Sequence, residues 1–183
     1  MRPSSSLTLK LAAFTALVSL GIFSSARAQQ PVASHDIPQS LIYEHEQTMT
    51  QLEALSHHPG AVGAEATKAL ALFRQHTARE TEYILPPLSL LPDLADGKVT
   101  PDMAWALEMT DKVAADREKI FAEHTEVTDR MNALYDAAIK AHDAEAADFA
   151  KGAAADSLND LEILEPTVML IGEFLRARLS TKP

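Results

Sequence analysis

The chain lacks cysteine, has few aromatic residues (5%), and carries fewer basic than acidic side chains. Without cysteine it can form no disulfide bond, no thiolate metal site and no redox-active thiol. Any metal must therefore be held by imidazole and carboxylate groups. The sequence also shows no serine–histidine–acid arrangement and no glycine-rich phosphate loop, so nothing marks a substrate pocket for catalysis.

The N-terminus has the pattern of a secretory signal peptide. Arg2 and Lys10 precede the apolar run LAAFTALVSLGIF, and small residues follow at Ala26 and Ala28. This pattern predicts a Sec-type signal peptide over residues 1–28, cleaved after Ala28. The apolar run is too short for a membrane-spanning helix. We therefore expect a periplasmic or secreted protein with a flexible segment at 29–37 and one domain at 38–183.

The scarcity of basic residues limits the partners of the exported chain. Residues 1–28 contain three of the 16 basic residues and none of the 26 acidic ones, so the mature chain has a formal net charge of −13. A chain this acidic is repelled by nucleic acid and by anionic lipid, and we expect neither as a partner. A metal cation is compatible with this charge, and the sequence names no protein partner.

Signals for β-strands are nearly absent, whereas apolar residues recur at intervals of three and four. This periodicity predicts an all-α protein, specifically an antiparallel up-down four-helix bundle. The helices are expected after Pro38, before Pro86, from Thr100 to about Ala141, and from about Asp143 onward.

Particular residues predict how these helices begin, bend and pack. Thr100, followed by a proline and an aspartate, is the expected N-cap of the third helix, and Asp143 marks the start of the fourth. Pro166 predicts a kink within the fourth helix. A regular helical period places Ile163 and Leu170 on the buried side of that helix.

An internal repeat connects the two halves of the chain. YEHEQTMTQLEAL aligns with AEHTEVTDRMNAL, which pairs His45 with His124 at an offset of 79 residues. HTARETEYILPPL aligns with DSLNDLEILEPTV, which pairs His76 with Asp156 and Glu80 with Asp160 at an offset of 80. The repeat predicts two helix hairpins related by a pseudo-twofold axis. Residues at i and i+4 share a helix face, so these ligand-type side chains can converge in the bundle core.

The pattern resembles the hemerythrin-like, or HHE cation-binding, family of four-helix bundles. The likeness lies in EHEQ with His45, HTARE with His76 and Glu80, and EHTE with His124. It implies a non-haem di-iron centre in which these three histidines are terminal ligands and Glu80 bridges. The second half departs from the family pattern, because Asp156 stands in place of histidine and Asp160 in place of glutamate.

These departures change the expected chemistry and leave the metal content open. Three imidazoles and three carboxylates are harder ligands than a histidine-rich set and favour ferric over ferrous iron. Because aspartate is one methylene shorter than glutamate, the site can hold two irons, one, or none. In the metal-free alternative, the same side chains pair with one another in a buried polar network, since unpaired buried charges are costly.

The sequence therefore predicts an exported hemerythrin-like protein that binds one or two non-haem iron ions. We expect a binding role that responds to oxygen, nitric oxide or redox state, with a small diatomic ligand, rather than turnover of a substrate. The predicted ligands are His45, His76, Glu80, His124, Asp156 and Asp160. One alternative is a metal-free periplasmic interaction module with a degenerate site, and another is a ferritin-like di-iron oxidase.

Overall fold

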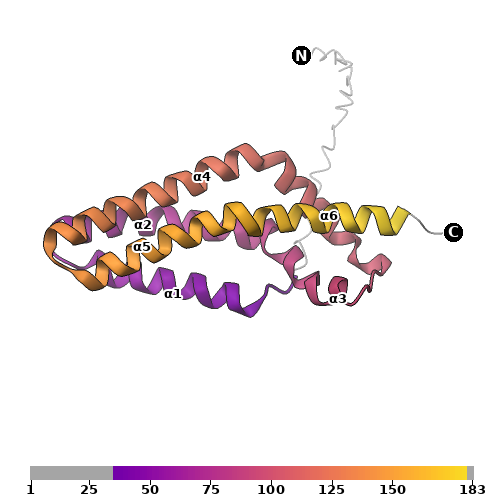
Figure 1. Ribbon diagram of the computed structural model, residues 1–183, viewed down its shortest axis with the longest axis horizontal. Helices are drawn as coiled ribbons and strands as arrows, with labels where there is room; N and C mark the ends of the chain where they lie inside the picture. The colour runs from indigo at the N-terminus through magenta and orange to yellow at the C-terminus, as the bar shows by residue number, and fades with distance from the viewer. Residues whose placement is uncertain (1–34, 181–183) are drawn as a thin grey trace, which may run out of the picture. The chain divides into compact units, whose positions relative to one another are not determined.

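The computed structural model describes residues 35–180, and the predicted signal peptide lies outside the described residues. Within that range the fold is entirely helical, with no β-strand. Figure 1 shows long helices lying side by side, with consecutive long helices running antiparallel. The α-helices are α1 Gln39–Ser56, α2 Gly60–Arg79, α3 Leu91–Ala95, α4 Trp105–Ala141, α5 Ala144–Asn159 and α6 Glu165–Ser180.

The expected fourth helix is present as two helices, α5 and α6, in one nearly continuous line (Figure 1). Four stretches of long helix therefore form the bundle: α1, α2, α4, and α5 with α6. The strongest packing is between α4 and α5, between α1 and α2, and between α2 and α4. By contrast, α1 and α5 pack loosely against each other. No helix within residues 35–180 is both long enough and apolar enough to cross a membrane.

The helix boundaries follow from local chemistry. The side chain of Asp143 accepts a hydrogen bond from the backbone N–H of Ala146 at 3.1 Å, which caps α5 as expected. Thr100 lies at the N-cap position before the 3₁₀ turn Pro101–Ala104, but its side chain makes no capping hydrogen bond. Thr100 is therefore the N-cap residue, as predicted, but without a side-chain cap, and Pro101 at the first position suits the start of this turn.

A wide, π-helical turn interrupts each of two helices at equivalent places. The turns are Glu80–Ile84, here η1, and Asp160–Leu164, here η4. Pro86 and Pro166 each stand six residues after the start of a turn. A proline has no N–H, and its ring clashes with the carbonyl four residues earlier. The preceding N–H bonds five residues back instead, from Leu85 to the Glu80 carbonyl at 2.8 Å and, likewise, from Glu165 to the Asp160 carbonyl.

The second π turn corrects the predicted packing of the fourth helix. Ile163 and Leu170 were expected to be buried, but they are 60% and 68% exposed. A π turn contains about one residue more than an α turn, so every following side chain is rotated by about 100°. The buried side of α6 is consequently shifted along the sequence to Val168, Ile171 and Leu175.

The core consists of two apolar clusters. One packs residues of α1, α2 and α5 against the second half of α4, including Leu52, Phe73 and Met131. The other packs η1 and η2 (Pro86–Leu90) against α6 and the first half of α4, including Tyr83 and Ile120. Two stretches of chain contribute residues to both clusters: one is α2 together with η1, and the other is α4. His76, Glu80 and His124, described next, lie on these elements between the two clusters.

Candidate metal centre

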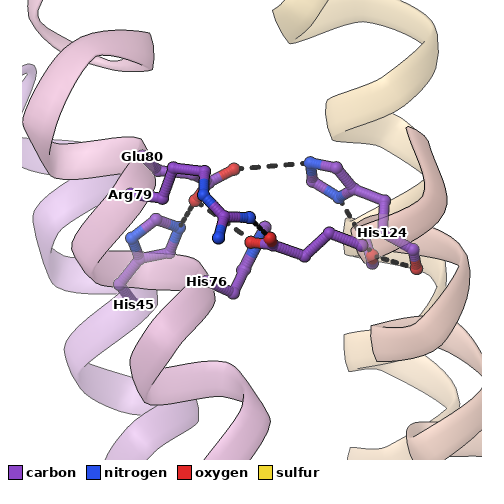
Figure 2. Close-up of polar contacts among 7 residues, drawn as sticks. His45, His76, Arg79, Glu80 and His124 are labelled. Atoms are coloured by element: carbon purple, nitrogen blue, oxygen red, sulfur yellow. Dashed lines mark hydrogen bonds and ion pairs between the residues drawn. The ribbon is translucent and has the colours of Figure 1, made fainter. Parts of the chain in front are cut away.

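The carboxylate of Glu80 lies at the centre of three histidine rings (Figure 2). Its Oε2 atom is 3.1 Å from Nε2 of His45 and 3.4 Å from Nε2 of His76. Its Oε1 atom is 3.6 Å from Nε2 of His124. The three rings come from α1, α2 and α4, so the site joins three helices. Glu80 is only 1% exposed, and neither of its oxygens has a partner with hydrogen-bond geometry among the described residues.

Four of these side chains form a group that could hold a metal ion. One ligand atom from each of His76, Glu80, His124 and Asp160 lies within 4.8 Å of the other three. Imidazole and carboxylate ligands bind zinc-like ions at about 2.0–2.2 Å, so ligand atoms on opposite sides of one ion are about 4.2 Å apart. The separations in the group reach up to 4.8 Å, so the side chains would move inward by about half an ångström or more to hold one ion.

The hydrogen bonds of His76 fix which of its ring nitrogens carries the proton. Nδ1 of His76 is 3.2 Å from Oε1 of Glu123, and the other oxygen of that carboxylate pairs with Arg79. An ionised carboxylate can only accept hydrogen bonds, so Nδ1 must donate. In the neutral ring Nε2 then has a free lone pair, and this lone pair lies beside the Glu80 carboxylate.

The same reasoning applies to His124. Its Nδ1 atom is 3.2 Å from Oγ of Ser157, and that hydroxyl donates its own proton to the backbone carbonyl of His124 at 3.3 Å. The hydroxyl can therefore only accept from Nδ1, which leaves Nε2 unprotonated in the neutral ring. Two buried acceptor nitrogens thus lie beside an acceptor carboxylate. A cation among them would remove this repulsion, as in sites where a second partner orients each metal-binding histidine.

Burial keeps two of the histidines neutral. Removal from water lowers the pKa of His124 to about 4, and the nearby His76 ring acts in the same direction. Burial also lowers the pKa of His76, although the Glu80 carboxylate opposes this effect. For His45, burial likewise favours the neutral ring, but contact with Glu80 outweighs it and the pKa of His45 is raised. His76 and His124 are therefore in the form that binds metal near neutral pH.

The pKa of Glu80 is lowered at this site, whereas the pKa values of Asp160 and Glu44 are raised. Burial opposes ionisation of Glu80, yet contact with His45 and the neighbouring imidazoles keep the pKa of Glu80 below its ordinary value. Burial, together with the charge of Glu80, raises the pKa of Asp160 to about 7. Burial and the charge of Asp156 raise the pKa of Glu44. The negative charges thus repel one another at the site, and a cation would reduce that repulsion.

The structure separates the six predicted ligands into three groups. His76, Glu80, His124 and Asp160 form the close group, and His45 contacts Glu80 from α1. Asp156 is exposed and lies outside the close group. It lines a cavity of about 10 Å³, together with His76 and Asp160. This volume is roughly enough for one water molecule. Binding of a metal by Asp156 stays a prediction.

Sequence reasoning missed the two residues that orient the rings. Glu123 directly precedes His124, but its side chain contacts His76 on the neighbouring helix α2. Ser157 directly follows Asp156, and it contacts His124 on α4. The repeated Glu-His pair was the available signal for Glu123. The helix register that directs each side chain toward a different helix could not be read from that pair.

The residues present fit a metal ion held by imidazole and carboxylate, with two acceptor nitrogens directed at an unbonded buried carboxylate. They do not identify which metal. Comparisons of the chain with protein-family models, with curated proteins and with solved structures found no match. The case for a metal centre therefore rests on the residues and their geometry.

Proposed function

We propose that this is an exported, hemerythrin-like four-helix bundle that binds non-haem iron in a carboxylate-rich centre. His45, His76 and His124 are the imidazole ligands, and Glu80 and Asp160 are the carboxylate ligands. Each oxygen of Glu80 faces different rings, which supports Glu80 as a carboxylate shared between two ions. The matching π turns that begin at Glu80 and Asp160 support a duplicated origin for the two halves.

One observation carries the proposal: the unprotonated Nε2 atoms of His76 and His124 lie 3.4 and 3.6 Å from oxygens of a buried carboxylate that has no hydrogen bond. A metal-free polar network would place a proton between each pair of acceptors. The partners of the two Nδ1 atoms, Glu123 and Ser157, direct the ring protons away from Glu80 instead. A cation bound between these groups would satisfy them.

Bound iron would supply reversible electron transfer and a position for a small ligand such as dioxygen or nitric oxide. A ligand set with fewer imidazoles than a histidine-rich centre favours the ferric state. The cavity beside His76 is about 10 Å³ and admits only a very small molecule. These features support a sensing or binding role, because the described residues that line the cavity leave no room for a larger substrate.

Metal analysis of protein purified after iron-replete expression tests the proposal. We expect near-stoichiometric iron and near-ultraviolet absorption in the wild-type protein. Both should be lost in Glu80→Gln, which keeps the side-chain volume but removes the charge. Glu82→Gln is the matched control, because Glu82 belongs to the same turn but is exposed.

The alternatives predict different results. A metal-free interaction module predicts trace metal that does not change in His76→Ala or Glu80→Gln, and this result would overturn the proposal. A ferritin-like oxidase predicts catalytic oxygen consumption when ferrous iron is supplied. We expect no turnover beyond the oxygen that one loading of the site consumes.

A further inference from the structure

A shallow groove runs between α1 and α5, the two loosely packed neighbours. It has a volume of about 450 Å³. Its walls include Tyr43 and Gln51 on α1, and Phe149 and Gly152 on α5. A Cβ atom added at Gly152 would meet nothing within 4 Å, so the space beside this glycine is open.

The groove leads to the candidate metal centre. The small cavity that reaches His76 and Asp160 shares four lining residues with the groove, namely Glu44, Thr48, Ala153 and Asp156. The groove and the cavity therefore adjoin at these four residues. At the inner end, Asp160 and His76 belong to the four-residue group around Glu80.

Charge along the groove has one sign. The groove is lined by three carboxylates, Glu44, Asp148 and Asp156, and none of the described residues that line it is lysine or arginine. The cavity beneath adds Asp160 and again no lysine or arginine among its described lining. Carboxylates of one sign along a partly apolar cleft concentrate the electric field and can raise the association rate of an ion by about 10- to 1,000-fold.

We infer that the groove between α1 and α5 is the loading path for the metal ion, and that Glu44 and Asp156 form an outer carboxylate pair that captures a divalent cation before it reaches Asp160 and Glu80. This inference rests on the proposed metal centre. It also gives Asp156 a role that fits its exposed position outside the close group of ligands. Glu44 and Asp156 change how fast the ion arrives, whereas the buried ligands determine how tightly it is held.

Stopped-flow absorbance with Co²⁺ as the probe tests the capture step on the metal-free full chain. We expect Glu44→Gln to lower the association rate about 3- to 10-fold at low ionic strength. This difference should largely vanish at about 0.5 M salt, where charges are screened over a few ångströms. Glu46→Gln is the matched control, because Glu46 is also exposed on α1 but lines neither the groove nor the cavity.

A second variant tests the path itself. Gly152→Leu fills open space beside the groove and replaces a glycine within a helix, so folding should be preserved. We expect it to slow Co²⁺ loading at both low and high salt, while the equilibrium affinity stays within about twofold of the wild-type value. Circular dichroism and the equilibrium affinity verify that each variant is folded with an intact site.

The results separate the two proposals. Normal equilibrium affinity together with wild-type loading rates in Glu44→Gln or in Gly152→Leu would overturn the loading path and leave the metal centre standing. Absence of equilibrium Co²⁺ binding in the wild-type protein would overturn both. Slower loading in both variants, with unchanged affinity, is the result that the inference predicts.

Discussion

Substitution of Glu80 by glutamine should abolish metal binding while it changes the stability of the metal-free protein little. Glu80 is 1% exposed, and its oxygens face the unprotonated nitrogens of His76 and His124. A glutamine loses the favourable contact between the Glu80 charge and His45 that keeps the pKa of Glu80 low, but its NH₂ group can donate to one of those nitrogens. Each of these opposing changes is worth about 1–2 kcal/mol, so the two metal-free proteins should differ by no more than about 2 kcal/mol, or roughly 6 °C in Tm for a domain of this size.

The assay is thermal and urea unfolding of wild-type and Glu80→Gln protein at pH 8, each with and without saturating metal. Without the Glu80 carboxylate, burial is the largest effect on the pKa of His45 and lowers it, so the neutral His45 ring is favoured in the variant. We expect the two proteins to be nearly equally stable without metal and the variant to be the less stable one with metal. Metal binding stabilises only the protein that holds it, by about 4 kcal/mol at a concentration 1,000 times the Kd.

An alternative origin of the stability of this site predicts a large loss of stability in the metal-free variant. If Glu80 and His45 form a structural ion pair in a metal-free network, breaking the pair should cost about 3–5 kcal/mol. A metal-free Glu80→Gln protein that is destabilised by this amount, with no response of the wild-type protein to metal, would refute the reasoning.

Three further predictions concern pH, ring orientation and packing. The pKa of Asp160 is raised to about 7, so the folded protein holds a proton on this carboxyl group, and the stability that this proton provides is lost as pH rises through 7. In urea unfolding at pH 8, the free energy of unfolding of Asp160→Asn should exceed that of the metal-free wild type by roughly 1–2 kcal/mol, after allowance for solvent screening. The difference should be smaller at pH 5. Glu123→Gln should weaken metal affinity about 10- to 100-fold in an equilibrium titration, because the His76 ring loses its charged partner, whereas the exposed Glu126→Gln should not. Gly172→Ala should cost about 1–3 kcal/mol in urea unfolding, because its Cβ would lie 2.3 Å from Oγ1 of Thr110, whereas Gly152→Ala should raise stability by about 0.5–1 kcal/mol.

The all-helical fold was predictable because its signals are local. Helical periodicity and the prolines mark most boundaries within one or two residues, and Asp143 caps α5 as the sequence indicates. The exposed Ile163 and Leu170 were not predictable by the same means. Their prediction assumed a constant period of 3.6 residues, and the π turn that begins at Asp160 breaks that period.

Much of the candidate site could be predicted because helix spacing and an internal repeat constrain it. His76 and Glu80 stand four residues apart, and the repeat relates Glu80 to Asp160, which the structure places in the same close group. The orienting partners of the rings could not be predicted, because Glu123 contacts a histidine on another helix. Such contacts depend on how far one helix is rotated against its neighbour, which residue spacing along a single helix does not specify.

Anomalous X-ray scattering at the iron absorption edge, from crystals of iron-loaded protein, tests the central claim most directly. The account predicts a peak among Nε2 of His76, Nε2 of His124 and the Glu80 carboxylate, at about 2.0–2.2 Å from each coordinating atom. A second peak on the side of Glu80 that faces His45 would show a dinuclear centre. Iron found only at surface groups such as His57 and His58, with no peak beside Glu80, would contradict the account.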